Sequence, residues 1–194
     1  MLCNIVELRR YTLHPGTRET LIELFDRAFI EPQEAAGMAV LGQFRDLDDA
    51  DSFVWLRGFP DMQSRRRGLE AFYGGPVWER HRDAANATMI DSDNVLLLRP
   101  TRPLDHDPTR RTTRGDAERR LTISIHHVEP GAAIDMPSDA LATLVTEHSP
   151  NTFPALPVRE DAEVVVIIGH KPHAAPALRS EVLRLEPTSR SALP

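Results

Sequence analysis

The sequence is poor in residues that cross-link a chain or place it in a membrane. Cys3 is the single cysteine among 194 residues, so neither an internal disulfide nor a cysteine-based zinc site can form. No apolar run approaches the roughly 18 residues of a membrane-spanning helix. The first residues lack the basic and apolar regions of a signal peptide. These absences predict a soluble, cytoplasmic protein with no membrane contact.

The charge balance argues against a nucleic-acid partner. There are 23 basic and 29 acidic residues, which gives a net charge of −6, whereas domains that bind nucleic acids usually carry a basic surface. Lys171 is the only lysine beside 22 arginines. Hydrophobic residues make up 41% and charged residues 27% of the chain, the composition of an ordinary globular protein. The length suits one large domain or two small ones.

Strand and helix patterns alternate along the first 100 residues. Their order predicts a ferredoxin-like β-α-β-β-α-β half over residues 1–100. A proline at position 32 ends or bends the first helix, and glycines at 74 and 75 divide the second. The predicted strands are 4–13, 39–45, 52–58 and 94–99, and the predicted helices lie between 17 and 36 and between 61 and 86.

The second half has fewer helix signals. Residues 101–120 are rich in proline and arginine and predict a linker or surface loop. Residues 121–194 predict a second, degenerate ferredoxin-like half in which the helices have shrunk. Its strands are expected at 121–128, 140–147, 164–169 and 182–185. The β-branched run at 164–168 predicts a strand covered on both faces.

Several motifs carry a family resemblance. They are ELRxYxLxPG at 7–16, GQFR at 42–45, FVWLRGF at 53–59, FYGGPVW at 72–78, ANATM at 85–89, NxFPxLPVR at 151–159 and LxPTxRS at 185–191. In order and spacing they resemble the NIPSNAP family, and the last two resemble its two-part bacterial members. The resemblance implies an α+β fold of the dimeric α+β barrel type, in which two sheets pack face to face around a cavity. It implies no shared reaction.

Strand alternation predicts a polar face on the first sheet. If Val6, Leu8, Val54 and Leu56 face the helices, the alternate residues face the barrel interior. Those expected there are Glu7, Arg9, Tyr11, Gln43, Arg45, Trp55 and Arg57. A positively charged pocket with aromatic walls suits an anionic, partly apolar small molecule. The alternative is an ion-pair network that serves barrel closure alone.

Two further segments offer candidate site residues. On the second helical segment, Trp78, His81, Arg82 and Asn86 share a broad face, and His81 or the nearby Tyr73 is a candidate general acid or base. The alternative for His81 is a packed, hydrogen-bonded helix residue. The proline-rich stretch 150–157 is stiff, and a lid formed there would present Asn151, Phe153 and Arg159. A crossover that merely covers the core is the alternative.

Metal and haem sites are weaker alternatives. Imidazole and carboxylate groups near the predicted strand ends are those of His127, Glu147, His148, His170 and His173. None of them forms a compact ligand motif on one element. We therefore expect neither a bound metal nor an organic cofactor, and keep a metal- or haem-dependent barrel enzyme as an alternative.

The sequence therefore predicts a protein that binds, and in the fuller hypothesis transforms, an anionic small molecule in the barrel cavity. A non-catalytic structural or interaction module is the alternative. Because the chain has two halves, it can close the barrel by itself. The helix-poor second half is expected to expose Val165, Ile167, Leu183 and Leu185, which predicts a homodimer formed through this patch.

Overall fold

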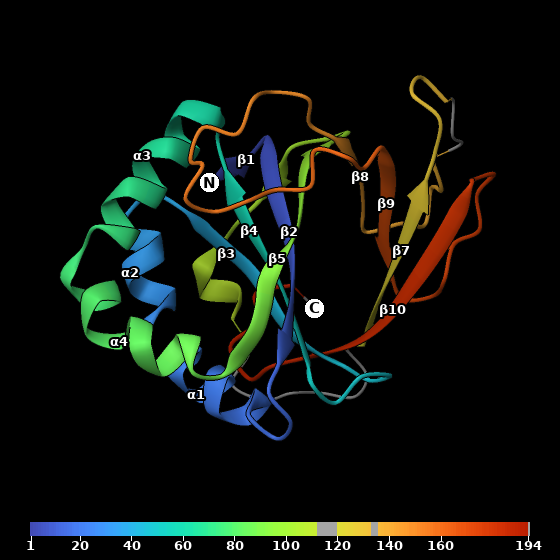
Figure 1. The fold of residues 1–194 in the computed structure, drawn as a ribbon. Helices are drawn as coiled ribbons and strands as arrows, with labels where there is room; N and C mark the ends of the chain where they lie inside the picture. Colours follow the sequence, from blue (N-terminus) through green and yellow to red (C-terminus); the bar gives the residue numbers. More distant parts are fainter. Residues whose placement is uncertain (112–119, 133–135, 194) are drawn as a thin grey trace.

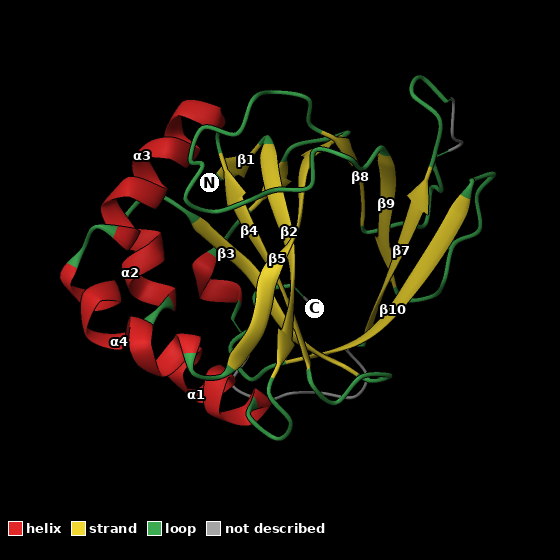
Figure 2. Cartoon of the chain, in the orientation of Figure 1, coloured by secondary structure: helices red, strands yellow, loops and turns green. Residues whose placement is uncertain are grey.

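The protein folds as a closed barrel with helices packed on one side (Figure 1). The computed structural model describes residues 1–111, 120–132 and 136–193. Within those ranges, the helices lie together against the strands of the N-terminal half. The strands of the C-terminal half are accompanied by loops (Figure 2).

The N-terminal half has the predicted order of strands and helices. The strands of its sheet are β2 (Ile5–Leu13), β3 (Ala39–Asp46), β4 (Ser52–Phe59) and β5 (Met89–Pro100). Its helices are α1 (Arg18–Ala28), α2 (Ile30–Ala35), α3 (Met62–Tyr73) and α4 (Pro76–Asn86).

Local sequence accounts for the helix boundaries. Pro32 lacks an N–H and crowds the carbonyl four residues earlier, and the chain accordingly breaks between α1 and α2 at Phe29. The left-handed φ of 85° at Gly37 follows the end of α2. The Asp61 carboxylate caps α3 by accepting a hydrogen bond from the Ser64 N–H at 2.6 Å.

The C-terminal half is a sheet without a helix in its described residues, 121–132 and 136–193. Its strands are β7 (Leu121–His127), β8 (Ala142–Thr146), β9 (Val164–Gly169) and β10 (Arg179–Pro187). Every residue of β9 is buried, which confirms the strand predicted to be covered on both faces. The connection 171–178 holds two prolines and forms no helix.

One chain closes the barrel by itself, as predicted. Its strand order is β10-β3-β4-β2-β5-β8-β9-β7, and each half contributes four neighbouring strands. The two halves meet at two seams, where β10 pairs with β3 and β5 pairs with β8. Each seam consists of three residue pairs.

The interior of the barrel is a filled apolar core. Val6, Leu8, Val54 and Leu56 belong to it, and each is at most 1% exposed. The others with them include Leu41, Phe44, Leu96, Leu98, Ile123, Ile125, Leu144, Val164, Val166, Ile168, Leu183 and Leu185. The expectation that Val6 and its partners face the helices, leaving a polar cavity inside the barrel, is therefore wrong.

A β-bulge in β3 interrupts the simple alternation of its side chains. The register against β4 shifts between Val40 and Gly42. Val40 packs with the helices, whereas Leu41 and Phe44 belong to the barrel core. A Cβ at Gly42 would lie 2.6 Å from the Phe44 ring and 3.0 Å from Ser191 Oγ, so glycine is required at this close approach.

The described part of the predicted linker is docked on the barrel. β6 (Leu104–Asp105) pairs with β1 (Leu2–Cys3), and the short 3-10 turn η1 (Pro108–Arg110) follows. His106 and Arg111 both contact the Glu34 carboxylate of α2. Residues 112–119 of the predicted linker lie outside the described residues.

The apolar patch expected on the second half is covered within the chain. Leu183 and Leu185 lie in the barrel core, and Val165 and Ile167 are at most 4% exposed in a separate small cluster. An exposed apolar patch therefore no longer supports the homodimer, which stays a prediction.

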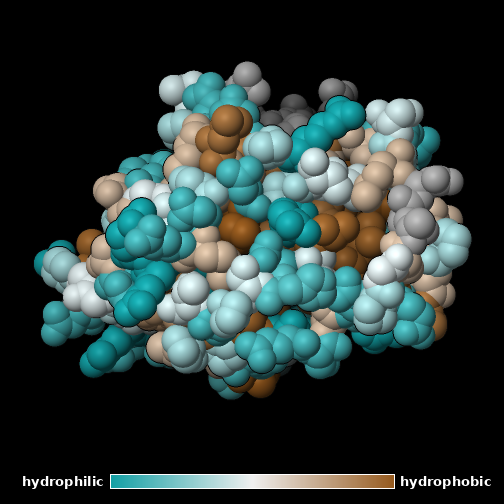
Figure 3. All heavy atoms as spheres, turned by 90° about the horizontal axis from the view of Figure 1, so that it is seen from above, coloured by the Kyte–Doolittle hydropathy of each residue, from teal (hydrophilic) through white to brown (hydrophobic). Residues whose placement is uncertain are grey.

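Seen from the top of Figure 1, the surface is mainly hydrophilic, with hydrophobic side chains near its middle (Figure 3). None of the described helices combines the length and hydrophobicity needed to span a bilayer.

Candidate functional site

A buried carboxylate, that of Glu7 on β2, is surrounded by three guanidinium groups. Its Oε2 accepts hydrogen bonds from Arg9 Nη1 at 2.9 Å and Arg57 Nη2 at 2.6 Å. Its Oε1 accepts one from Arg65 Nε at 2.7 Å. All four side chains are at most 1% exposed. We call these residues the Glu7–arginine cluster; it carries two positive charges in excess.

The charges in this cluster fix the protonation of Glu7. Burial raises the pKa of its carboxyl, but the combined charges of Arg57, Arg9 and Arg65 outweigh burial and hold that pKa well below its ordinary value. Burial also lowers the pKa of the Arg65 guanidinium. Positive charge in excess is costly in a buried place unless an anion compensates it. The cluster therefore favours a negatively charged group nearby.

Polar side chains extend the cluster toward the helices. The Tyr11 hydroxyl accepts a hydrogen bond from Arg9 Nε at 3.0 Å. Arg57 Nη1 donates to Gln33 Oε1 of α2 at 3.1 Å and to the Tyr73 hydroxyl of α3 at 3.4 Å. Burial raises the pKa of the Tyr11 phenol, although the charge of Arg9 opposes that rise. Tyr11 is therefore a neutral phenol at physiological pH.

An indole ring lies between the two strand arginines. The Cζ atoms of Arg57 and Arg9 lie 5.0 and 5.6 Å from the ring centroid of Trp55. Cation–π attraction at such distances stabilises a guanidinium that is shielded from water. The sheet thus presents charges, one phenol and an indole to the helix layer, whose own contribution is mainly aromatic.

An open cleft lies beside this cluster. It has a volume of about 460 Å³ and is lined by Glu70, Tyr73, Gly74, Trp78, Phe153, Ala155 and Leu156. The Tyr73 ring stacks on Phe153 with centroids 6.0 Å apart. Tyr73 and Trp78 also line an inner cavity of about 30 Å³, whose wall includes Tyr11, Gln33 and Trp55. Two aromatic rings therefore separate the open cleft from the charged interior.

The connection between β8 and β9 covers one side of the site. Arg65 Nη1 donates to Asn151 Oδ1 at 3.0 Å and to Thr152 Oγ1 at 3.2 Å. Asn151 Oδ1 also accepts from the N–H of Phe153, which fixes the turn that places this ring on the cleft. The C-terminal half thus supplies part of the wall of a site built mainly from the N-terminal half.

Comparison with known proteins is consistent with this architecture. The sequence profile of the NIPSNAP family matches residues 6–103, just over half of the chain. The chain belongs to the NIPSNAP family. The resemblance predicted from the sequence motifs is confirmed. No curated protein matches this chain.

Several solved structures resemble this NIPSNAP protein. A Fusobacterium nucleatum protein named "putative monooxygenase" aligns over 94% of this chain and 91% of its own, with a TM-score of 0.59 and 6% identity. One of the same name from Lactobacillus acidophilus aligns over 93% and 92%, with a TM-score of 0.55 and 11% identity. A NIPSNAP-like domain protein from Burkholderia xenovorans is 24% identical over 48% of this chain and 81% of its own, with a TM-score of 0.44. The first two likenesses show a shared fold and nothing about activity.

Most of the predicted site residues lie together in the NIPSNAP structure. Glu7, Arg9, Tyr11, Trp55 and Arg57 share one face of the sheet. Tyr73, Trp78, Asn151 and Phe153 surround that face from the helices and the β8–β9 connection. The shared face was predicted correctly, but it meets the helices instead of the barrel interior.

Other predicted residues lie outside the cluster. Gln43 and Arg45 share the predicted face of the sheet, opposite Trp55 and Phe53 in the register, whereas Arg82, Asn86 and Arg159 lie elsewhere. The guanidinium of Arg45 pairs with the exposed Glu19, and that of Arg159 pairs with Asp161. Gln43 is buried beside the C-terminal segment, where Thr188 contacts it. None of these contacts joins the Glu7–arginine cluster.

His81, a candidate acid or base, is half-buried on α4. Its ring lies 6.2 Å from the Phe29 ring in an edge-to-face contact. Among the described residues it has neither a hydrogen-bond nor an ion-pair partner that would orient it for proton transfer. This packing matches the alternative of a packed helix residue more closely than a catalytic role, but the hydrogen bond expected in that alternative is absent among the described residues.

Three residues of the site escaped the sequence prediction. Arg65, Gln33 and Thr152 all hydrogen-bond within or next to the cluster. Arg65 follows Met62 and precedes Leu69 at helical spacing, so it sits in the buried stripe of α3. A charged residue in such a stripe is the signal that would have identified it.

The described residues contain no group of three or more side chains that could hold a metal ion. Two of the histidines considered for that role contact carboxylates at separate places. His127 lies 3.1 Å from Glu181, and His148 lies 3.4 Å from Glu163.

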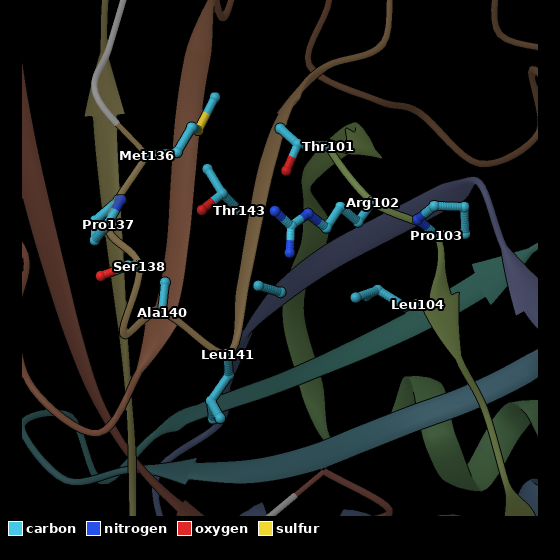
Figure 4. A pocket seen from close by; sticks show the side chains of 11 residues that line it. Thr101, Arg102, Pro103, Leu104, Met136, Pro137, Ser138, Ala140, Leu141 and Thr143 are labelled. Carbon is cyan, nitrogen blue, oxygen red and sulfur yellow. The ribbon is translucent and has the colours of Figure 1, made fainter.

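A second cavity lies between the loop after β5 and the segment before β8. Its volume is about 550 Å³, and Figure 4 shows the Arg102 side chain extending into it opposite Thr143. Met136 and Leu141 on its rim are almost half exposed. Arg102 itself is exposed, and no buried charge lies among the lining residues. The site beneath the helices is therefore the stronger candidate.

Proposed function

We propose that this NIPSNAP protein binds an anionic, partly aromatic small molecule between its helices and the N-terminal sheet. The observation that carries the proposal is the buried Glu7–arginine cluster with its two excess positive charges. An anionic ligand compensates that charge at short range, where low dielectric strengthens attraction. The proposed site lies in the layer beneath the helices, and not in the barrel interior as the sequence predicts, because apolar side chains fill that interior.

The cleft supports the aromatic part of the proposal. Its walls are the rings of Tyr73, Trp78 and Phe153, and it leads toward Arg57 through Tyr73. Flat apolar molecules bind well between such rings. Tyr73 lines both the cleft and the inner cavity, so its hydroxyl is the proton donor that a bound molecule meets first.

Calorimetric titration with three matched naphthalenes tests the proposal. We expect 2-naphthoate or 2-naphtholate to bind at least about tenfold more tightly than neutral 2-methoxynaphthalene, since a charge-assisted contact is worth about 1.5–3 kcal/mol. Trp78→Ala in the cleft should weaken binding of the anion. Leu141→Ala, at the rim of the other cavity, is the matched control and should leave it unchanged.

Equal affinity for the neutral and charged naphthalenes would overturn the proposal. So would binding that Trp78→Ala leaves intact. Absence of binding by all three would favour a structural or interaction module.

A further inference from the structure

The indole N–H of Trp55 has no hydrogen-bond partner. Its Nε1 is buried and unpaired among the described residues, and the side chain is 2% exposed. A buried donor without an acceptor is unusual in a well-packed protein, because the group has lost its water. Trp55 lines the inner cavity of about 30 Å³ beneath the helices.

A second donor lines the same cavity. The Tyr11 hydroxyl accepts a hydrogen bond from Arg9 Nε at 3.0 Å. Within the described residues its own hydrogen has no acceptor. The rings of Tyr11 and Trp55 meet edge to face with centroids 6.1 Å apart. Two side chains with a free donor group therefore line one small space.

The size and lining of the cavity limit what it can hold. A volume near 30 Å³ has room for a group the size of a water oxygen. Apart from its polar members, the wall consists of apolar and aromatic side chains: Leu21, Phe25, Phe29, Phe72, Trp78, Ala85 and Met89. Gln33, Tyr73 and Trp78 also carry donor groups, so the volume of the cavity, and not a lack of donors, limits it to a single oxygen.

The surrounding charge favours a negative oxygen over a neutral one. Arg57 and Arg9 lie against the ring of Trp55, at 5.0 and 5.6 Å from its centroid. Their positive charges strengthen the N–H as a donor and stabilise negative charge next to it. Because burial keeps Tyr11 protonated by raising its pKa, its hydroxyl is available to donate.

We infer that the inner cavity receives a single anionic oxygen attached to an aromatic ring, that of a phenolate or enolate, with Trp55 and Tyr11 as its donors. The inference rests on the proposed function and narrows its ligand class. The ring occupies the aromatic cleft as Tyr73 and Trp78 move apart. A carboxylate, sulfonate or phosphate brings two or three oxygens to a space built for one.

Binding in this way releases a proton. A phenol that is neutral in water loses its O–H proton to the solvent, and the electron pair stays on the oxygen in the cavity. The protein thereby lowers the pKa of the bound phenol, as opposite charges and hydrogen bonds to the anion do. No oxidant or cofactor enters this step.

Absorbance of 2-naphthol tests the inference on the unmodified protein. This probe is neutral in neutral buffer, and its anion absorbs at longer wavelength. We expect added protein to produce the anion band in neutral buffer, which requires the pKa of the bound probe to fall from the ordinary phenol value of about 10 to near 7, that is by about three units. We also expect 2-naphthol to bind at least about tenfold more tightly than 2-naphthoate.

Two variants test whether Trp55 and Tyr11 donate the hydrogen bonds to the bound oxygen. Trp55→Phe removes the indole N–H and Tyr11→Phe removes the hydroxyl, and each should weaken naphtholate binding by about tenfold or more. Leu141→Ala, at the rim of the other cavity, is the control and should keep the pKa shift. If Trp55→Phe does not fold, Tyr11→Phe and the spectrum of the unmodified protein still decide.

The outcomes separate this inference from the proposed function. If 2-naphthoate binds as tightly as 2-naphthol, or 2-naphthol binds in its neutral form, the single-oxygen cavity is overturned while anion binding stands. If neither anion binds better than 2-methoxynaphthalene, the proposed function fails and this inference with it.

Discussion

Arg65 of α3 donates a hydrogen bond to Glu7 of β2 through Nε and another to Asn151 through Nη1. One guanidinium therefore joins the helix layer, the N-terminal sheet and the connection between β8 and β9. The planar fork of arginine allows this, because its nitrogens reach different partners at once. The β8–β9 connection is thus held by the same group that neutralises the buried carboxylate.

Replacing Glu7 by Gln should destabilise the protein by about 3–5 kcal/mol. The substitution leaves three buried guanidinium groups without their counter-charge, and urea unfolding measures the loss. Glu19→Gln is the matched control, because Glu19 pairs with Arg45 at the surface and should cost less than about 1 kcal/mol. Similar small losses in both variants would contradict a structural role for the buried charge.

The same carboxylate predicts a pH dependence. Although burial raises its pKa, the three arginines lower it further, so the folded-state pKa of Glu7 lies below the unfolded one. Such a group contributes stability above the unfolded pKa, and that contribution is lost as pH falls below about 4.3 toward the folded value. The free energy of unfolding of the wild type should therefore fall more steeply in acid than that of Glu7→Gln. Parallel curves would refute the shift.

Glu34→Gln tests whether the segment after β5 is docked. His106 Nε2 lies 2.8 Å from Glu34 Oε1, and Arg111 pairs with the same oxygen. We expect a loss of about 1–3 kcal/mol, because both partners are largely buried and the charge-assisted bonds disappear. Differential scanning calorimetry measures it. Glu31→Gln, which removes an exposed pair with Arg190, serves as the control.

Cys3 should be inert in the folded protein. Its side chain is fully buried, and burial raises the pKa of its thiol to about 11, so little thiolate forms in mildly alkaline solution. A thiol reagent such as Ellman's should react slowly with the native protein and rapidly in urea. Leu104→Ala removes packing from the strand paired with Cys3 and should speed the native reaction. Equal rates in native buffer and urea would show that the thiol is accessible.

The fold was largely predictable because the helix and strand signals are local. Pro32, Gly37 and the pair Gly74–Gly75 act on their own backbone, and the elements end close to where these residues predict. The β-bulge after Val40 was not predictable in the same way. It depends on Gly42 packing against Phe44 and Ser191, and the latter is distant in sequence.

The site was predicted as a set of residues but misplaced. Alternation along β2 correctly separates Glu7 and Arg9 from Val6 and Leu8. Both faces of this sheet are buried, one by helices and the other by the opposite sheet. Alternation alone therefore does not predict which face packs against the helices. The apolar set fills the barrel, and the charged set needs partners that arrive on α2 and α3, such as Gln33 and Arg65. Those partners depend on tertiary contacts.

The number of paired residues differs between neighbouring strands of the barrel, and this affects how copies of the chain can associate. Eight residue pairs join β2 to β4 and seven join β10 to β7, but three join the sheets at each seam. Breaking both seams leaves each four-stranded sheet whole. Two opened molecules can then pair the N-terminal sheet of one with the C-terminal sheet of the other and remake both barrels with the same contacts. Domain exchange along these two lines is therefore a low-cost route from this single-chain barrel to a dimer.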